Sequence, residues 1–163
     1  MNESDQAGEL ERLHPASFSW ALSCCRRNRE EAEEVLQASY LKLLEGRARF
    51  DGRSSFKTFL FGVIRRTAGE QRRRVALRAL LFRTVSPLFT PETSDTDARL
   101  HRLDAALARL PRRQLEVIEL RLQHEMTLEE AASALSISVG SARVHYARAK
   151  ERLRRLLDEE AGA

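Results

Sequence analysis

Residues 127 to 157 read TLEEAASALSISVGSARVHYARAKERLRRLL, and this stretch predicts two helices joined by a tight turn. Thr127 and Glu130 have capping-box spacing, so we expect the first helix to begin there. The run Ser136-Ile137-Ser138 is typical of a turn, and its second serine is placed to cap the next helix. Two helices joined in this way predict a helix-turn-helix.

The second of these helices combines an apolar stripe with a basic surface. The inward stripe is Ala142, Tyr146, Ala149 and Leu153. The outward surface is Gly140, Arg143, Val144 and Ala147, flanked by Ser141 and Arg148. Small residues let a helix approach base edges, and an arginine bonds guanine through two hydrogen bonds. We therefore predict a DNA recognition helix, with a solvated basic face as the alternative.

The composition indicates a moderately basic globular protein. The chain has 163 residues, 42% of them hydrophobic and 32% charged, and a net charge of +4. No apolar run approaches the roughly 20 residues of a membrane span, and the N-terminus, MNESDQAGELE, is too acidic for a signal peptide. We therefore expect a cytoplasmic protein without membrane insertion.

Cysteine and histidine positions argue against a metal site and against catalysis. Cys24 and Cys25 are adjacent, which disfavours a structural disulfide between them and provides no metal-ligand spacing. The four histidines, at positions 14, 101, 124 and 145, are scattered along the chain. We expect no catalytic residue, no metal and no cofactor, and hence no enzyme.

Upstream, the apolar spacing predicts a first helix over residues 10–26 and a second that begins at Arg29, after the cap Asn28. The inward residues of the second helix are Ala32, Val35, Leu36, Ser39, Tyr40, Leu43 and Leu44. Its opposite face carries Glu34, Gln37, Ala38 and Leu41. A single exposed leucine usually means nothing. Leu41, however, is surrounded by acidic and amide groups, and an apolar centre within a polar rim is typical of a small protein interface.

A third helix is expected from Phe56, capped by Ser54 or Ser55. Its inward residues are Phe59, Leu60, Val63, Ile64 and Thr67, and its outward residues are Thr58, Phe61, Gly62, Arg65, Gly69 and Arg72. An aromatic ring beside guanidinium groups stacks on unpaired bases and holds a phosphate backbone. The outward face therefore predicts nucleic-acid contact, with an exposed phenylalanine in a solvated arginine run as the alternative. Residues 76–82 either extend this helix or pack back on the domain.

Periodicity disappears between Thr84 and Asp97, where Pro87 and Pro91 stand in a Ser/Thr/Asp-rich run. Beyond it, two more helices are expected on either side of Pro111. The apolar residues of the first are Leu100, Leu103, Ala106, Leu107 and Leu110, and the second turns Leu115, Ile118 and Leu122 inward. We predict an all-α fold with an N-terminal helical bundle at 10–83, a flexible linker at 84–98 and a helix-turn-helix domain at 99–158.

Two stretches resemble a known family. Residues 32–66, AEEVLQASYLKLLEGRARFDGRSSFKTFLFGVIRR, resemble the core-binding and melting domain of bacterial sigma factors. Residues 106–157, from ALARLPRRQLEV to ERLRRLL, resemble their C-terminal promoter-reading domain. With only these two domains and a short linker, the chain resembles the extracytoplasmic-function group of the sigma-70 family.

The resemblance implies a transcription initiation factor with three contact surfaces. The residues implied to bind the β′ clamp helices of core RNA polymerase are Glu33, Glu34, Gln37 and Leu41. Those implied to hold the melted −10 strand are Arg53, Ser54, Lys57, Phe61, Arg65 and Arg72. Those implied to contact the −35 duplex are Ser141, Arg143, Val144, His145, Ala147, Arg148 and Lys150. The β flap of polymerase and an anti-sigma factor are further implied partners.

Two other functions compete with this one. The first is an ordinary helix-turn-helix regulator with an N-terminal sensor or dimerisation module, although this leaves the Arg-and-Phe helix unexplained. The second is a sigma-like decoy that binds an anti-sigma factor without directing transcription. Ala38 stands where the family usually has an acidic residue, which supports the decoy.

Overall fold

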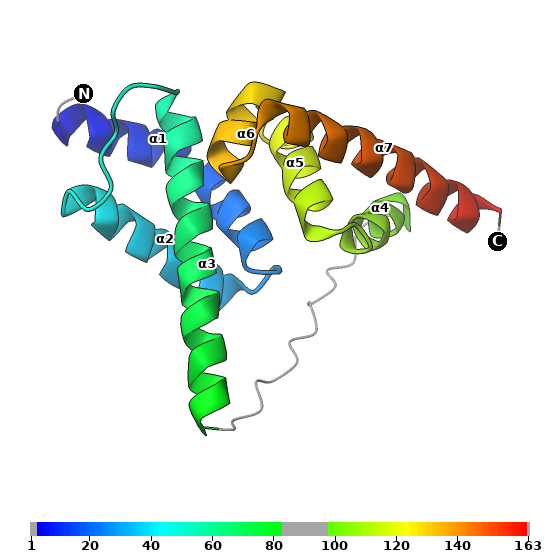
Figure 1. The fold of residues 1–163 in the computed structure, drawn as a ribbon, viewed down its shortest axis with the longest axis horizontal. Helices are drawn as coiled ribbons and strands as arrows, with labels where there is room; N and C mark the ends of the chain where they lie inside the picture. The colour runs from blue at the N-terminus through cyan, green and yellow to red at the C-terminus, as the bar shows by residue number, and fades with distance from the viewer. Residues whose placement is uncertain (1–2, 83–97, 163) are drawn as a thin grey trace. The chain divides into compact units, whose positions relative to one another are not determined.

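The computed structural model describes residues 3–82 and 98–162, and these form seven α-helices and no strand (Figure 1). The helices are α1 (Glu3–Cys24), α2 (Arg29–Leu44), α3 (Phe56–Phe82), α4 (Ala98–Ala108), α5 (Arg112–Leu122), α6 (Leu128–Leu135) and α7 (Val139–Ala161). They group into two compact units, α1–α3 and α4–α7. The predicted all-α class with two helical domains is confirmed.

Side-chain caps set the start of four helices. Asn28 Oδ1 accepts the Glu31 N–H at 3.1 Å, and Ser55 Oγ accepts the Thr58 N–H at 3.1 Å. Ser138 Oγ accepts the Ser141 N–H at 3.0 Å. At α6, Thr127 Oγ1 accepts the Glu130 N–H at 3.1 Å, while the Glu130 carboxylate accepts the Thr127 N–H at 2.8 Å. These caps confirm the predicted starts because each satisfies an N–H that has no partner inside its helix.

Thr127→Ala is expected to lower the free energy of unfolding of the α4–α7 unit by about 1 kcal/mol, because it removes one half of the capping box. Urea unfolding followed by far-UV circular dichroism measures this loss. Ser133→Ala, at an exposed position of the same helix, is the control and is expected to stay within about 0.5 kcal/mol of wild type. A Thr127→Ala protein as stable as the control would show that the cap contributes nothing.

In the first unit, α3 packs against both α1 and α2, so it is buried on two sides. Leu60, Val63 and Ile64 are buried as predicted. Thr58, Phe61 and Gly62, which we expected on an outward face, are buried as well. That expectation was wrong because helical periodicity assumes a single buried face, whereas this segment has a neighbouring helix on each side.

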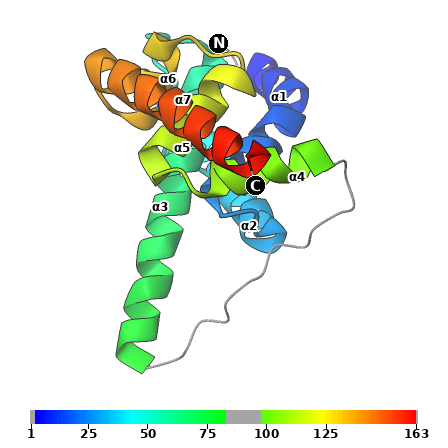
Figure 2. The same cartoon turned by 90° about the vertical axis from the view of Figure 1, so that its right-hand side faces the viewer.

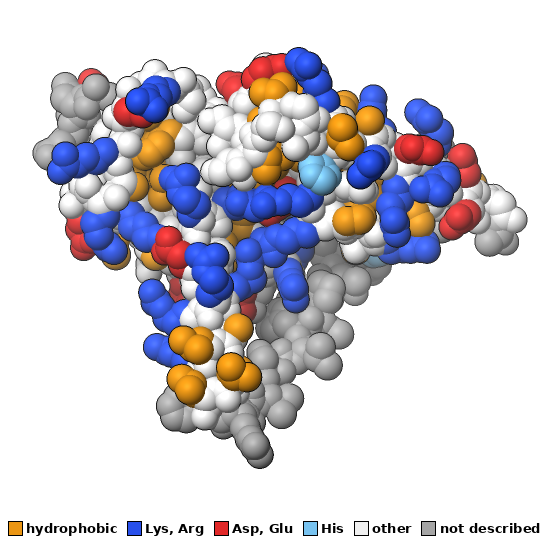
Figure 3. Space-filling model, viewed as in Figure 1, with side chains coloured by type: hydrophobic (Ala, Val, Ile, Leu, Met, Phe, Trp, Pro, Cys, Tyr) orange, Lys and Arg blue, Asp and Glu red, His pale blue; other side chains and the backbone are white. Residues whose placement is uncertain are grey.

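The last turns of α3 run past α1 and α2 (Figures 1 and 2). Residues 76–82 therefore extend the helix and do not pack back on the domain. The exposed apolar side chains of this end are Val75, Leu77, Leu80 and Leu81. Figure 3 shows hydrophobic side chains gathered there.

Two further features of the first unit differ from the predictions: the start of its first helix and the burial of Leu44. The first helix starts at Glu3 and not near residue 10, because the polar residues before Leu10 continue the helix without adding to the apolar stripe. Leu44, predicted to face inward, has 72% of its surface exposed. It occupies the last position of α2, where the chain turns away through Glu45 and Gly46.

In the second unit, α5 contacts both α6 and α7, which also contact each other. One cluster joins its Ile118 to residues of α4 and α7, and the buried members are Ala106, Leu110, Ile118, Ala149, Leu153 and Leu156. Val117 and Leu120 are also buried, whereas Leu122, predicted to face inward, is 60% exposed. Leu122 is the last residue of α5, where the apolar stripe runs past the packed part of the helix.

The predicted linker, 84–98, lies outside the described residues except for Ala98, which begins α4. The domain limits at 83 and 99 therefore stay predictions.

Candidate nucleic-acid and polymerase interfaces

The helix-turn-helix is built from α6 and α7. Ala131, Ala132 and Ala142 are buried where the two helices meet, and small side chains allow such a close approach. Ser136 takes a left-handed conformation, with φ at 54°, and ends α6. The inner stripe of α7 is confirmed, since Ala142, Ala149 and Leu153 are buried and Tyr146 is half-buried.

The outward surface of α7 presents the side chains that we predicted for DNA contact. Its exposed members are Gly140, Ser141, Arg143, Val144, Ala147, Arg148 and Lys150. Val144 is 47% exposed. His145 is only half-buried, and its Nδ1 is enclosed without a hydrogen-bond partner among the described residues. Lys150 Nζ lies 4.7 Å from the Tyr146 ring centroid. The surface is thus basic, with small and apolar residues beside the arginines.

Arg143 contacts a residue that sequence reasoning missed. Its Nη2 donates to Glu129 Oε1 of α6 at 3.1 Å. The pKa of the Glu129 carboxyl is held below its usual value by a hydrogen bond from its own backbone N–H and by the Arg143 guanidinium. Glu129 therefore carries a negative charge at neutral pH. The two residues lie in different helices, so no periodic pattern in the sequence could have paired them.

The predicted polymerase-binding face lies along α2. Glu34, Gln37 and Leu41 are exposed, and Leu41 has 50% of its surface accessible. Leu44 lies one turn further along the same face, so two exposed leucines share it. Helical spacing would have found Leu44, had we not assigned it to the inward stripe.

The acidic residues of the α2 face have local partners. Glu33 accepts a hydrogen bond from Arg29 Nε at 3.0 Å, and Glu34 accepts one from Gln71 Nε2 of α3 at 2.7 Å. Lys42 binds Glu70 and Thr67 of α3. The contacts of Glu34 and Lys42 anchor α2 on α3, and the two leucines stay uncovered within the described residues.

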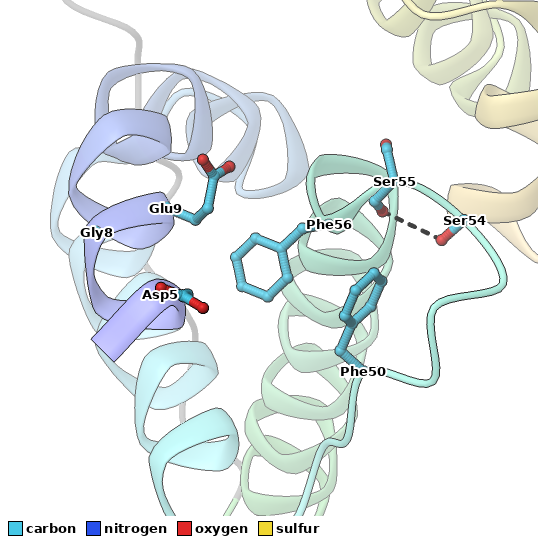
Figure 4. Close-up of a pocket in the computed structure, with 7 residues that line it drawn as sticks. All are labelled: Asp5, Gly8, Glu9, Phe50, Ser54, Ser55 and Phe56. Atoms are coloured by element: carbon cyan, nitrogen blue, oxygen red, sulfur yellow. Dashed lines mark hydrogen bonds between the residues drawn. The ribbon is translucent and has the colours of Figure 1, made fainter. Parts of the chain in front are cut away.

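The loop from Phe50 to Ser55 borders a hollow of about 720 Å³ against the start of α1 (Figure 4). The lining residues are Asp5, Gly8, Glu9, Phe50, Ser54, Ser55 and Phe56. The Phe50 ring packs edge-on against Phe56, with centroids 5.4 Å apart, which stiffens the base of the loop. Exposed Arg53 pairs with Asp51 at 3.1 Å, and Ser54 Oγ donates to the Ser55 carbonyl at 3.2 Å.

Two of the residues predicted to hold the −10 strand are placed otherwise. Phe61 is fully buried and stacks on Trp20, with centroids 5.8 Å apart and an interplanar angle of 6°. The Trp20 indole N–H donates to the Phe61 carbonyl at 3.0 Å. Arg72 is half-buried and donates to the Cys24 carbonyl at the end of α1, at 2.7 Å. Phe61 is therefore a core residue and Arg72 a tie between α3 and α1.

Lys57 and Arg65 stay at the edge of the surface of α3. Both are half-buried, and Lys57 Nζ lies 5.7 Å from the centroid of the buried Phe61 ring. The structure thus brings Arg53, Ser54 and Lys57 together around the loop and the first turn of α3. Arg65 lies two turns further along the same helix.

No cluster of three or more His, Cys, Asp or Glu side chains in residues 3–82 and 98–162 could hold a metal ion. Cys24 and Cys25 are both buried, and neither forms a disulfide. None of the described helices is long and apolar enough to span a membrane.

Both helical units match families of known proteins. Residues 10–78 match the family of sigma-70 region 2, and residues 100–153 match sigma-70 region 4. The RNA polymerase sigma factor CarQ of Myxococcus xanthus is 32% identical over 137 residues, which cover 82% of this chain and 78% of CarQ. The chain belongs to the extracytoplasmic-function group of the sigma-70 family.

Two solved structures share the fold of this sigma factor. RpoE of Bartonella quintana, crystallised with the anti-sigma factor NepR, matches with a TM-score of 0.77 at 24% identity, over 94% of this chain and 97% of RpoE. CnrH, in complex with the cytosolic domain of CnrY, matches with a TM-score of 0.67 at 23% identity, over 97% of this chain and 90% of CnrH. At these identities the likeness concerns the fold alone.

Membership in the family establishes the class of function. The sigma factor is a transcription initiation factor that binds core RNA polymerase and directs it to promoters, and it is not an enzyme. The region 2 match contains the α2 face and the loop beside α3, and the region 4 match contains the outward surface of α7 up to Leu153.

Proposed function

We propose that this sigma factor uses three surfaces: the α2 face to bind polymerase, the loop at Phe50–Ser55 to hold the melted −10 strand, and α7 to read the −35 duplex. The observation that carries the proposal is the outward surface of α7. Its basic and small side chains are exposed together, while its inner stripe is built into the core of the unit. Such a helix enters a major groove without losing its own packing.

On α7, we assign base contacts to Arg143, Val144, Ala147 and Arg148 and backbone contacts to Ser141, His145 and Lys150. Arginine suits the O6 and N7 acceptors of guanine, and exposed valine suits the methyl group of thymine. Hydroxyl, imidazole and ammonium groups bind phosphate oxygens, which sets the register of the helix on the duplex.

For the −10 strand, the supported contacts are Arg53 and Ser54 of the loop and Lys57 and Arg65 of α3. The hollow beside Phe50 and Phe56 is lined by Ser54 and also by the carboxylates of Asp5 and Glu9 from α1. Arg53 and Lys57 are close to this lining in the sequence, so basic and hydroxyl groups lie near aromatic rings on the loop side. This is the chemistry that retains a single strand. Phe61 and Arg72 do not enter the proposal as DNA contacts, since both are committed to the packing of the unit.

For core polymerase, the proposed interface has Leu41 and Leu44 at its centre and Glu33, Glu34 and Gln37 at its rim. Two exposed leucines surrounded by acidic and amide groups match the usual arrangement of a protein interface, an apolar centre within a polar border. The partner on this face is the β′ clamp helices, and the second unit contacts the β flap.

We further propose that the protein acts in the cytoplasm and is restrained there by an anti-sigma factor. Two proteins of the same fold, RpoE and CnrH, were solved with NepR and with the cytosolic domain of CnrY, respectively. The proposed domain limits are 10–83 and 99–158, with the linker at 84–98 between them.

Transcription from genomic fragments by purified core polymerase, with and without the sigma factor, tests the proposal. Specific start sites that depend on the added protein are expected. A protein that binds an anti-sigma factor but supports no start would instead be the decoy that Ala38 supported. The promoters obtained in this way supply the duplexes for the experiments below.

Arg143→Ala is expected to reduce discrimination at one −35 base pair by about 1–3 kcal/mol, because a bidentate contact with guanine would be lost. Binding of the polymerase holoenzyme to a set of duplexes, each with one base pair replaced, measures this. Uniform weakening across all duplexes would instead identify Arg143 as a phosphate contact.

A further inference from the structure

The ion pair between Glu129 and Arg143 joins the two helices of the helix-turn-helix on its outer side. The atoms lie 3.1 Å apart, and both side chains remain exposed, Arg143 at 65% and Glu129 at 59%. Glu129 is the second residue of α6, and Arg143 is in the second turn of α7. The carboxylate therefore reaches across to the side chain that we assign to base reading.

Glu129 does not supply the carboxylate of the capping box beside it. That carboxylate is Glu130, which accepts the Thr127 N–H at 2.8 Å. Glu129 accepts hydrogen bonds from its own backbone N–H and from the Thr127 side chain, and it is also the glutamate whose carboxylate reaches α7, at Arg143.

A carboxylate in the first turn of α6 favours the start of that helix, but this does not require a contact with Arg143. General affinity for DNA does not explain the pair either. An ion pair between exposed side chains contributes little to folding. A carboxylate close to a DNA-binding surface repels phosphates and opposes the electrostatic attraction on which non-specific binding depends. A negative charge at this position therefore weakens binding to DNA in general.

The Arg143 guanidinium can still hydrogen-bond a base while it is bound to Glu129. Arginine has five N–H donors in a rigid, planar fork. One contact, from Nη2 to Glu129, leaves donors for the O6 and N7 acceptors of guanine. Holding the fork before DNA binds removes part of the ordering cost that binding otherwise carries.

We propose that Glu129 is a positioning residue for promoter recognition: it holds the guanidinium of Arg143 toward base edges and away from phosphates, and so determines sequence discrimination. This inference rests on the proposed role of Arg143 in reading a base. Glu129 itself contacts no base, and its effect passes through the arginine.

The test measures binding of the holoenzyme to a promoter duplex and to the same duplex with each −35 base pair replaced in turn. Glu129→Gln is expected to lower discrimination at the base pair read by Arg143 by roughly threefold or more. The loss is smaller than for removal of the arginine, because the bidentate contact with guanine is weakened and not abolished. Binding to non-promoter DNA is expected to rise, because a negative charge is removed. The variant carrying both Glu129→Gln and Arg143→Ala is expected to discriminate no worse than Arg143→Ala alone.

Two control variants separate the contact from charge. Glu129→Asp keeps the negative charge at the start of α6 but shortens the side chain by one methylene, so it too is expected to lose discrimination. Glu151→Gln removes an exposed carboxylate elsewhere on α7 and is expected to leave the base preference unchanged. Thermal unfolding of each variant shows whether the second unit stays folded.

The possible failures are distinguishable. If Arg143→Ala alters discrimination at one base pair and Glu129→Gln does not, the positioning role is overturned and base reading by Arg143 stands. If Glu129→Gln alters a different base pair, the glutamate acts independently of the arginine and the inference is also wrong. If Arg143→Ala alters no base pair, the proposed role of Arg143 fails, and the positioning role fails with it.

Discussion

Phe61→Ala is expected to lower the free energy of unfolding of the α1–α3 unit by about 3–5 kcal/mol, the usual cost of removing a fully buried aromatic ring. The ring stacks on Trp20 and lies in the second turn of α3, which packs against both α1 and α2, so the cavity has little chance to close. Since small domains are stable by about 5–15 kcal/mol, this loss is a large share of the total. Urea unfolding followed by tryptophan fluorescence measures it, because Trp20 is the only tryptophan in the chain.

Leu77→Ala is the matched control for this experiment. Leu77 lies in the same helix but is exposed, and its truncation is expected to change stability by no more than about 0.5 kcal/mol. A Phe61→Ala protein that unfolds like wild type but no longer retains a single-stranded −10 oligonucleotide would contradict the core assignment. It would restore the base-stacking role first predicted from the sequence.

Leu41→Arg is expected to weaken binding to core RNA polymerase by about 30-fold or more, the effect of losing an interface hot spot of about 2 kcal/mol. The substitution places a charge at the centre of the proposed apolar contact. Because Leu41 is already half exposed, the free sigma factor is expected to keep its stability. Titration of labelled core polymerase measures the affinity, and binding of −35 DNA by the sigma factor shows that the second unit is intact.

The same substitution at two other leucines defines the limits of this interface. Leu44→Arg is expected to weaken polymerase binding as well, since Leu44 lies on the same face of α2 and is 72% exposed. Leu77→Arg, at an exposed leucine of α3, is the control and is expected to bind polymerase as wild type does. Equal affinity for all three variants and wild type would exclude the α2 face as the polymerase contact.

Local signals predicted the elements of the fold well. The caps at Asn28, Thr127 and Ser138 depend only on residues three positions apart, so short-range chemistry was sufficient to find them. The inner stripe and the outward surface of α7 were also predicted, because this helix has one buried side and one solvent side. Sequence resemblance then identified the family, which composition and spacing alone left open.

The errors fall where a helix has more than one neighbour or comes to its end. Phe61 was placed on the outside because a single apolar stripe was assumed for α3, which has a helix on each side. Leu122 and Leu44 were placed inside because they continue a stripe into the last residue of their helices, where both side chains are exposed.

The sequence by itself determined where the capped helices begin and which side of α7 faces outward, since both depend on residues close together in the chain. It also identified the family, through the resemblance of two blocks in the right order. Only the tertiary structure decided that Phe61 is core, that Arg72 ties α3 to α1 and that Glu129 holds Arg143. These contacts join residues 14 to 48 positions apart. Helical periodicity relates only residues three or four positions apart, so contacts over these longer separations form only when helices pack against one another.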